Sequence, residues 1–94
     1  MNQYALLYLK SYLITNRFLQ NNIICCIEEM SEVTKVLTKY LRGREEFNKK
    51  DLEEEISHAL LMLDIVRARF HISTDTVEKY QVEALKKAIR EDSK

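Results

Sequence analysis

The sequence predicts an all-α protein, and three features point to that fold class. The 94 residues include one glycine and no proline, and the turns that link strands lean heavily on both. Hydrophobic residues make up 46% and charged residues 32%, which is a globular balance. Apolar residues recur at intervals of three and four, the spacing of one helix face. We therefore expect one domain over residues 1–94, built from four antiparallel helices.

The first helix is predicted over about residues 2–14. Leu6, Leu9, Leu13 and their neighbours give it a wide apolar face, wider than a surface helix needs. The segment is too short to span a bilayer and lacks the basic start of a signal peptide. A chain of this size buries only a modest share of its surface. The wide face therefore predicts oligomerisation, as a homodimer or a homotetramer.

The second helix is predicted over residues 17–41, and the third from Asn48 or Asp51 to near His71. Gly43 suits the end of the second helix, where Arg42 lies near the negative end of the helix dipole. Each helix has one expected apolar stripe. The stripes are Leu19, Ile23, Cys26, Met30, Val33, Leu37 and Tyr40, then Leu52, Ile56, Ala59, Leu63, Val66 and Phe70.

The fourth helix is predicted over about residues 75–91, after the candidate caps Ser73, Thr74 and Asp75. Its expected buried side consists of Val77, Tyr80, Ala84, Leu85 and Ala88.

Charge and cysteine content narrow the function classes. The chain has 15 basic and 15 acidic residues and no formal net charge, which argues against a nucleic-acid coating protein. Cys25 and Cys26 are neighbours that point in different directions on a helix, so a bridge between them is not expected. The absence of a disulfide framework is typical of a reducing cytoplasm. We expect neither a nucleic-acid partner nor a membrane partner.

Two short acidic patterns are the candidates for chemistry. Glu29 and Glu32 lie three residues apart, as do Glu55 and His58, so the members of each pair share a helix face. Each of the four residues precedes an apolar stripe residue and should lie at the stripe's border. If the helices pack antiparallel, the pairs can meet, and their three carboxylates would repel one another without a cation.

The same pattern also has a plain structural interpretation. Acid pairs at this spacing arise by chance in a chain with 15 acidic residues among 94, as Asp51/Glu54 and Asp75/Glu78 illustrate. A solvated acidic helix face therefore stays open as an alternative, and a lone histidine is more often structural than a metal ligand.

Three longer strings, residues 27–33, 39–43 and 52–64, resemble the MazG-like nucleotide pyrophosphohydrolases. The likeness is greatest to the short single-domain members common in bacteriophages and their hosts, and it spans residues 17–85. It implies that Glu29 and Glu32 match the family's Glu-x-x-Glu pair and that Glu55 begins its Glu-x-x-Asp motif. These residues would hold Mg²⁺ against a nucleoside triphosphate, which is cleaved to the monophosphate and pyrophosphate. Glu28 would be an outer-shell group or base.

The sequence also departs from the family pattern. His58 stands where the family has Asp, and an imidazole favours softer ions such as Mn²⁺, Fe²⁺ or Zn²⁺ over Mg²⁺. Gln81 and Ala84 stand where phage relatives often carry Lys and Arg. Other phosphate-binding candidates are Lys39, Arg42, Lys86 and Lys87. The resemblance thus implies an intact scaffold with an altered, or even inactive, site.

Two other functions remain open from the residues alone. Glu55-x-x-His58 together with a glutamate from another helix is the ligand pattern of ferritin-like di-iron bundles. The remaining alternative is a helical interaction module without chemistry.

Overall fold

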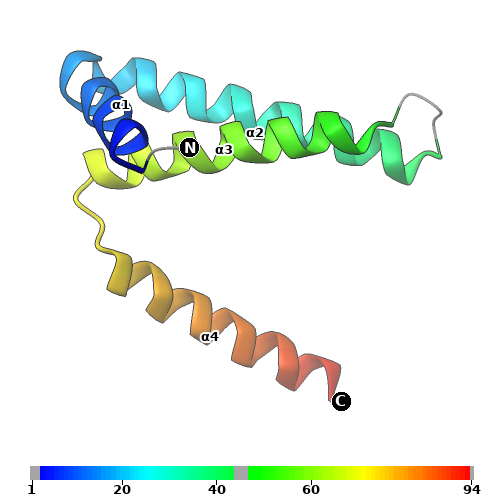
Figure 1. Cartoon of the computed structure of the whole chain (residues 1–94). Coiled ribbons are helices and arrows are strands. Elements are labelled where there is room, and N and C mark those ends of the chain that lie inside the picture. The colour runs from blue at the N-terminus through cyan, green and yellow to red at the C-terminus, as the bar shows by residue number, and fades with distance from the viewer. Residues whose placement is uncertain (1–2, 44–46, 94) are drawn as a thin grey trace.

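The computed structural model describes residues 3–43 and 47–93, and within those ranges it contains helices and no strand. The helices are α1 (Gln3–Asn16), α2 (Leu19–Leu41), α3 (Lys49–Arg69) and α4 (Thr74–Asp92) (Figure 1). The predicted all-α class is confirmed. The predicted start of the first helix at residue 2 lies outside the described residues. No helix in the described ranges is both long and apolar enough to span a membrane.

α2 and α3 form an antiparallel hairpin, and α1 lies across the end where α2 begins and α3 finishes (Figure 1). The core sits at that end. Cys26, Met62 and Ile65 are buried there, and Leu13 and Ile14 of α1 pack against them. The α2–α3 hairpin therefore provides the surface against which α1 packs.

The buried stripes of α2 and α3 are rotated from the predicted ones. Met30, Leu37, Tyr40, Ile56, Leu63 and Phe70 were expected to be buried, but each is at least 40% exposed. The predicted burial of Cys26 and Ala59 is confirmed. The other buried residues of these helices, which the predicted stripes left out, are Asn22 and Val36 on α2 and Met62 and Ile65 on α3. Both helices carry apolar residues on more than one face, so spacing alone allowed either choice. The small Cys26 and Ala59 side chains at the contact let the helices approach closely.

A residue with left-handed backbone geometry follows each of the two hairpin helices. Gly43 has a φ of 66°, as predicted for a helix stop, and His71 has a φ of 56° after α3. The His71 amide donates to the Ala68 carbonyl and the Ile72 amide to the Arg67 carbonyl. This pair of bonds is a Schellman cap. The cap ends α3 at Arg69, two residues before the predicted end.

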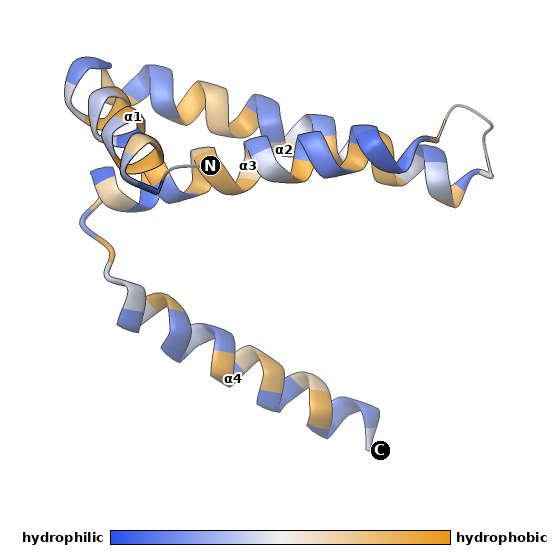
Figure 2. Cartoon of the chain, viewed as in Figure 1, coloured by the Kyte–Doolittle hydropathy of each residue, from blue (hydrophilic) through white to orange (hydrophobic). Residues whose placement is uncertain are grey.

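α4 leaves the hairpin at an angle and none of its residues is buried (Figure 1). Tyr80 and Leu85 are 60% and 64% exposed, so the expectation that they are buried is wrong for the single chain, as it is for Ala84 and Ala88. Val77 alone of the expected set is partly buried. Figure 2 shows apolar residues along α4 that no other helix covers. The amphipathic pattern is present, but the described residues cover it only partly, at Val77 near the start of the helix.

Asn22 is an internal polar residue whose side-chain amide makes no hydrogen bond among the described residues. It is fully buried, and neither its amide nitrogen nor its amide oxygen has a partner among the described residues. Burying such a group costs free energy that a hydrocarbon side chain of similar shape would not.

We expect Asn22→Leu to stabilise the protein by about 1–2 kcal/mol, because it removes two unpaired polar atoms from the core. Thermal unfolding followed by circular dichroism measures the effect. Asn21→Leu is the control, because Asn21 is the exposed neighbour on the same helix. A lower Tm for Asn22→Leu alone would show that the amide has a favourable partner.

His71→Gly should raise the free energy of unfolding by about 1 kcal/mol, because a non-glycine residue pays for its left-handed backbone. Gly43→Ala should lower it by a similar amount for the same reason. Chemical denaturation of both variants provides the test. Equal denaturation midpoints for His71→Gly and the parent would show that the left-handed backbone at His71 costs no free energy.

Candidate metal site

Glu29, Glu55 and His58 come together between α2 and α3. One potential ligand atom from each lies within 4.8 Å of the others. His58 Nδ1 is 3.5 Å from Glu29 Oε2 and 4.0 Å from Glu55 Oε2. Glu29 is three residues beyond the buried Cys26, and Glu55 is four before the buried Ala59, so the packing of these small residues brings the carboxylates face to face. We call these three residues the triad.

The triad carries a concentration of negative charge that the protein only partly offsets. The Glu29 and Glu55 side chains are 30% and 24% exposed, whereas His58 is 54% exposed. Among the described residues, His58 is the sole ion-pair partner of either glutamate, and it is charged only when protonated. Two carboxylates and an imidazole suit Zn²⁺, Mn²⁺ or Fe²⁺ as ligands.

Glu32 and Glu28 are not part of the triad. The Glu32 carboxylate instead pairs with Lys35 at 3.2 Å on the surface of α2, and Glu28 is exposed. The Glu32 side chain is 46% exposed, against 30% for Glu29, so it lies further from the contact between the helices. Of the four ligands predicted from the sequence, the structure brings together three.

Lys39 lies in the last turn of α2, and Arg42 is the cap residue that follows the helix. They line a shallow groove of about 330 Å³ with Thr34, Lys35 and Thr38, and no triad residue borders it. Lys39 is ten residues beyond Glu29, or ~15 Å along the helix. Within one chain these cations are therefore separate from the triad. Lys86 and Lys87 are exposed on α4.

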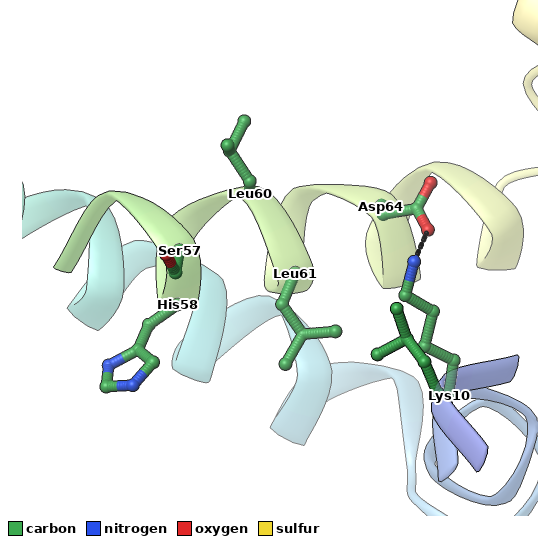
Figure 3. A pocket seen from close by; sticks show the side chains of 7 residues that line it. Lys10, Ser57, His58, Leu60, Leu61 and Asp64 are labelled. Atoms are coloured by element: carbon green, nitrogen blue, oxygen red, sulfur yellow. Dashed lines mark hydrogen bonds and ion pairs between the residues drawn. The ribbon is translucent and has the colours of Figure 1, made fainter. Parts of the chain in front are cut away.

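A larger groove adjoins the triad. It has a volume of about 570 Å³ and is lined by Leu6, Lys10, Ser57, His58, Leu60, Leu61 and Asp64. Figure 3 shows His58 towards one end and the Lys10–Asp64 ion pair at the other, with Leu61 between them. Sequence reasoning missed this groove. The sequence feature that could have indicated it is Lys10, a charged residue within the otherwise apolar pattern of α1.

The Asp64 side chain on α3 forms ion pairs with Lys10 of α1 and with Arg67 near the end of α3. Its Oδ2 accepts from Lys10 Nζ at 2.8 Å, and its Oδ1 accepts from Arg67 Nη2 at 2.6 Å. The hydrogen bond from Lys10, followed by that from Arg67, lowers the pKa of Asp64 below its usual value. Arg67 also donates to the Ile72 carbonyl, so the same cluster holds the turn before α4.

The two cysteines are both free thiols, as expected. Cys26 is in the core, and burial raises its pKa. Cys25 is partly buried, with Arg17 Nη1 3.5 Å from its sulfur. Neither cysteine belongs to the triad.

Comparison with known proteins finds no family model, curated protein or solved structure that matches this chain.

We expect Asp64→Asn to lower the free energy of unfolding by about 1 kcal/mol at pH 7, because the partly exposed ion pairs with Lys10 and Arg67 are lost. The folded-state pKa is depressed, so this stabilisation is present above roughly pH 4 and is lost as the pH falls through the folded value. Denaturant titrations from pH 7 to pH 2.5 measure it. Asp92→Asn, at the exposed end of α4, is the control, and a pH-independent difference for Asp64→Asn would contradict the cause.

Proposed function

We propose that the protein is a metal-dependent nucleoside triphosphate pyrophosphohydrolase of the MazG-like kind. The observation that carries the proposal is the triad: a glutamate from one helix meets a glutamate and a histidine from the antiparallel helix. The resemblance of residues 17–85 to that family also supports the proposal, since it implies that Glu29 and Glu55 match positions of the family's acidic motifs. We further propose a cytoplasmic location, which two free thiols support.

The donor set of the triad fits a divalent ion. Glu29, Glu55 and His58 would hold it, and a bound ion there supplies neutralisation of phosphate charge and a more acidic water. Because one ligand is a neutral imidazole rather than a carboxylate, we propose Mn²⁺ or another softer ion ahead of Mg²⁺. Half-burial of the glutamates keeps water from fully screening their charge.

Glu32 and Glu28 keep secondary roles in the proposal. The ion pair between Glu32 and Lys35 is exposed and therefore weak, which leaves Glu32 available as a further ligand. Glu28, exposed on the same turn of helix, is the candidate base for the attacking water.

We also propose that the protein acts as a homodimer or homotetramer. Three large side chains of α1, Tyr4, Tyr8 and Leu9, are each at least 61% exposed, and most of the apolar face of α4 is exposed as well. Burial of these surfaces would favour association. Because Lys39 and Arg42 lie at and just beyond the end of α2, far from the triad of their own chain, we propose that they contact phosphate in the site of a neighbouring copy.

A second function is favoured by the same ligands. Glu29 with Glu55-x-x-His58 is one half of the ligand set that binds two iron ions in helical bundles. A second hairpin would supply the other half. This alternative predicts iron oxidation without release of pyrophosphate.

A panel of NTPs and dNTPs with Mg²⁺ or Mn²⁺, assayed by pyrophosphate release, tests the proposed activity. We expect turnover with Mn²⁺ and loss of at least about 100-fold in Glu55→Gln, because a charged ligand is removed. Glu54→Gln, an exposed neighbour, should retain activity. Ferroxidase activity without pyrophosphate release would instead support the di-iron alternative.

His58→Asp should shift the metal preference towards Mg²⁺, because a hard anionic ligand replaces a nitrogen. Titrations with Mg²⁺ and Mn²⁺ should show at least about tenfold tighter Mg²⁺ binding than in the parent. Identical Mg²⁺ titrations in the two proteins would remove His58 from the site.

A further inference from the structure

We propose that the groove between α1 and α3 binds the nucleoside half of the substrate, an assignment that rests on the proposed function. The starting observation is that His58 belongs both to the triad and to the lining of the groove. A ligand whose phosphates meet the triad can therefore lay its uncharged end in the groove without crossing solvent. The groove is the natural continuation of the metal site.

The size of the groove fits this occupant. Its volume of about 570 Å³ is in the range of small-molecule sites. His58 and Asp64 are six residues apart on α3, which places them ~9 Å apart along the helix axis. That span corresponds to a sugar and a base in line, and Figure 3 shows the two residues towards opposite ends of the groove.

The lining also has the chemistry of a base-binding surface. Leu6, Leu60 and Leu61 provide apolar contact of the kind that receives the faces of a planar ring. At the far end, Lys10 and Asp64 stand side by side at 2.8 Å. An ammonium group has three donors, and Asp64 takes one of those of Lys10. The pair therefore offers a donor next to an acceptor, matching the carbonyl and N–H groups on the edge of a base.

This arrangement distinguishes a nucleotide from an inorganic polyphosphate. Tripolyphosphate can use the triad-bound ion but gains nothing from leucine side chains. A nucleoside triphosphate gains both contacts. Relative affinity for the two probes is therefore a direct measure of the groove's contribution.

Calorimetric titration in Mn²⁺ with an α,β-methylene nucleoside triphosphate and with tripolyphosphate makes the comparison. We expect at least one nucleotide analogue of a four-base panel to bind about tenfold tighter than tripolyphosphate. Ser57→Phe should fill the groove and abolish that preference while leaving the tripolyphosphate affinity unchanged. Ser31→Phe is the matched control, because both hydroxyls are exposed and donate to the carbonyl four residues earlier.

A second pair of variants keeps the test independent of the folding of Ser57→Phe. Leu6 lines the groove and Leu7 does not, although both are exposed on α1. Leu6→Gln should reduce the nucleotide preference severalfold, and Leu7→Gln should leave it intact.

The outcomes separate the two proposals. Equal affinity of tripolyphosphate and every nucleotide analogue in the parent would overturn the groove assignment and leave the metal-dependent activity standing. A preference that survives both Ser57→Phe and Leu6→Gln would overturn it as well. Failure of both probes to bind in Mn²⁺ would overturn the groove assignment together with the proposed function.

Discussion

The antiparallel contact between α2 and α3 is the constraint on which the rest of the molecule depends. Cys26 and Ala59 are small enough to let the two helices approach, and the large Met62 and Ile65 fill the end of the contact. The same contact places Glu29 opposite Glu55 on the packing face, where solvent is partly excluded. The two carboxylates repel each other there, and this repulsion destabilises the packing of α2 against α3 unless a positive charge lies between them. Stability of the hairpin and occupation of the triad by a cation are therefore linked, since a ligand that binds only the folded form stabilises it.

A second set of interactions fixes α1 over the hairpin. Arg69 Nη1 lies 2.8 Å from both the Ile14 and Arg17 carbonyl oxygens, and so satisfies backbone groups at the end of α1 that its own helix leaves open. Lys10 reaches Asp64 from the same side. These charged contacts bridge segments more than fifty residues apart in sequence. By fixing α1 over the hairpin, these contacts also form the groove, because Leu6 and Lys10 of α1 line one side of it and residues of α3 line the other.

The sequence was informative where a local rule dominates. It correctly predicted four helices and the stop at Gly43, because glycine at a left-handed position has few substitutes. It also brought Glu29, Glu55 and His58 together from spacing and an assumed antiparallel pairing. It succeeded only in part where several faces competed. The predicted stripes of α2 and α3 contained the buried Cys26 and Ala59, but they also contained the exposed Met30 and Ile56. The expected convergence of Glu32 with the triad is not found either, because its carboxylate pairs with Lys35 on the surface of α2. Burial on α4 depends on partners that the amphipathic pattern cannot supply.

The isolation of α4 has a consequence for the order of folding. α2 and α3 are joined by a short connection, so their contacts are local and can form early. Most of the stability of a helix in a protein comes from tertiary packing of its amphipathic face, and the described residues cover α4 only partly, at Val77. Its backbone hydrogen bonds should open independently of the hairpin and exchange their protons with solvent long before those of the core. The α2–α3 hairpin is therefore expected to fold cooperatively, whereas the stability of α4 depends on the surface against which its apolar face packs.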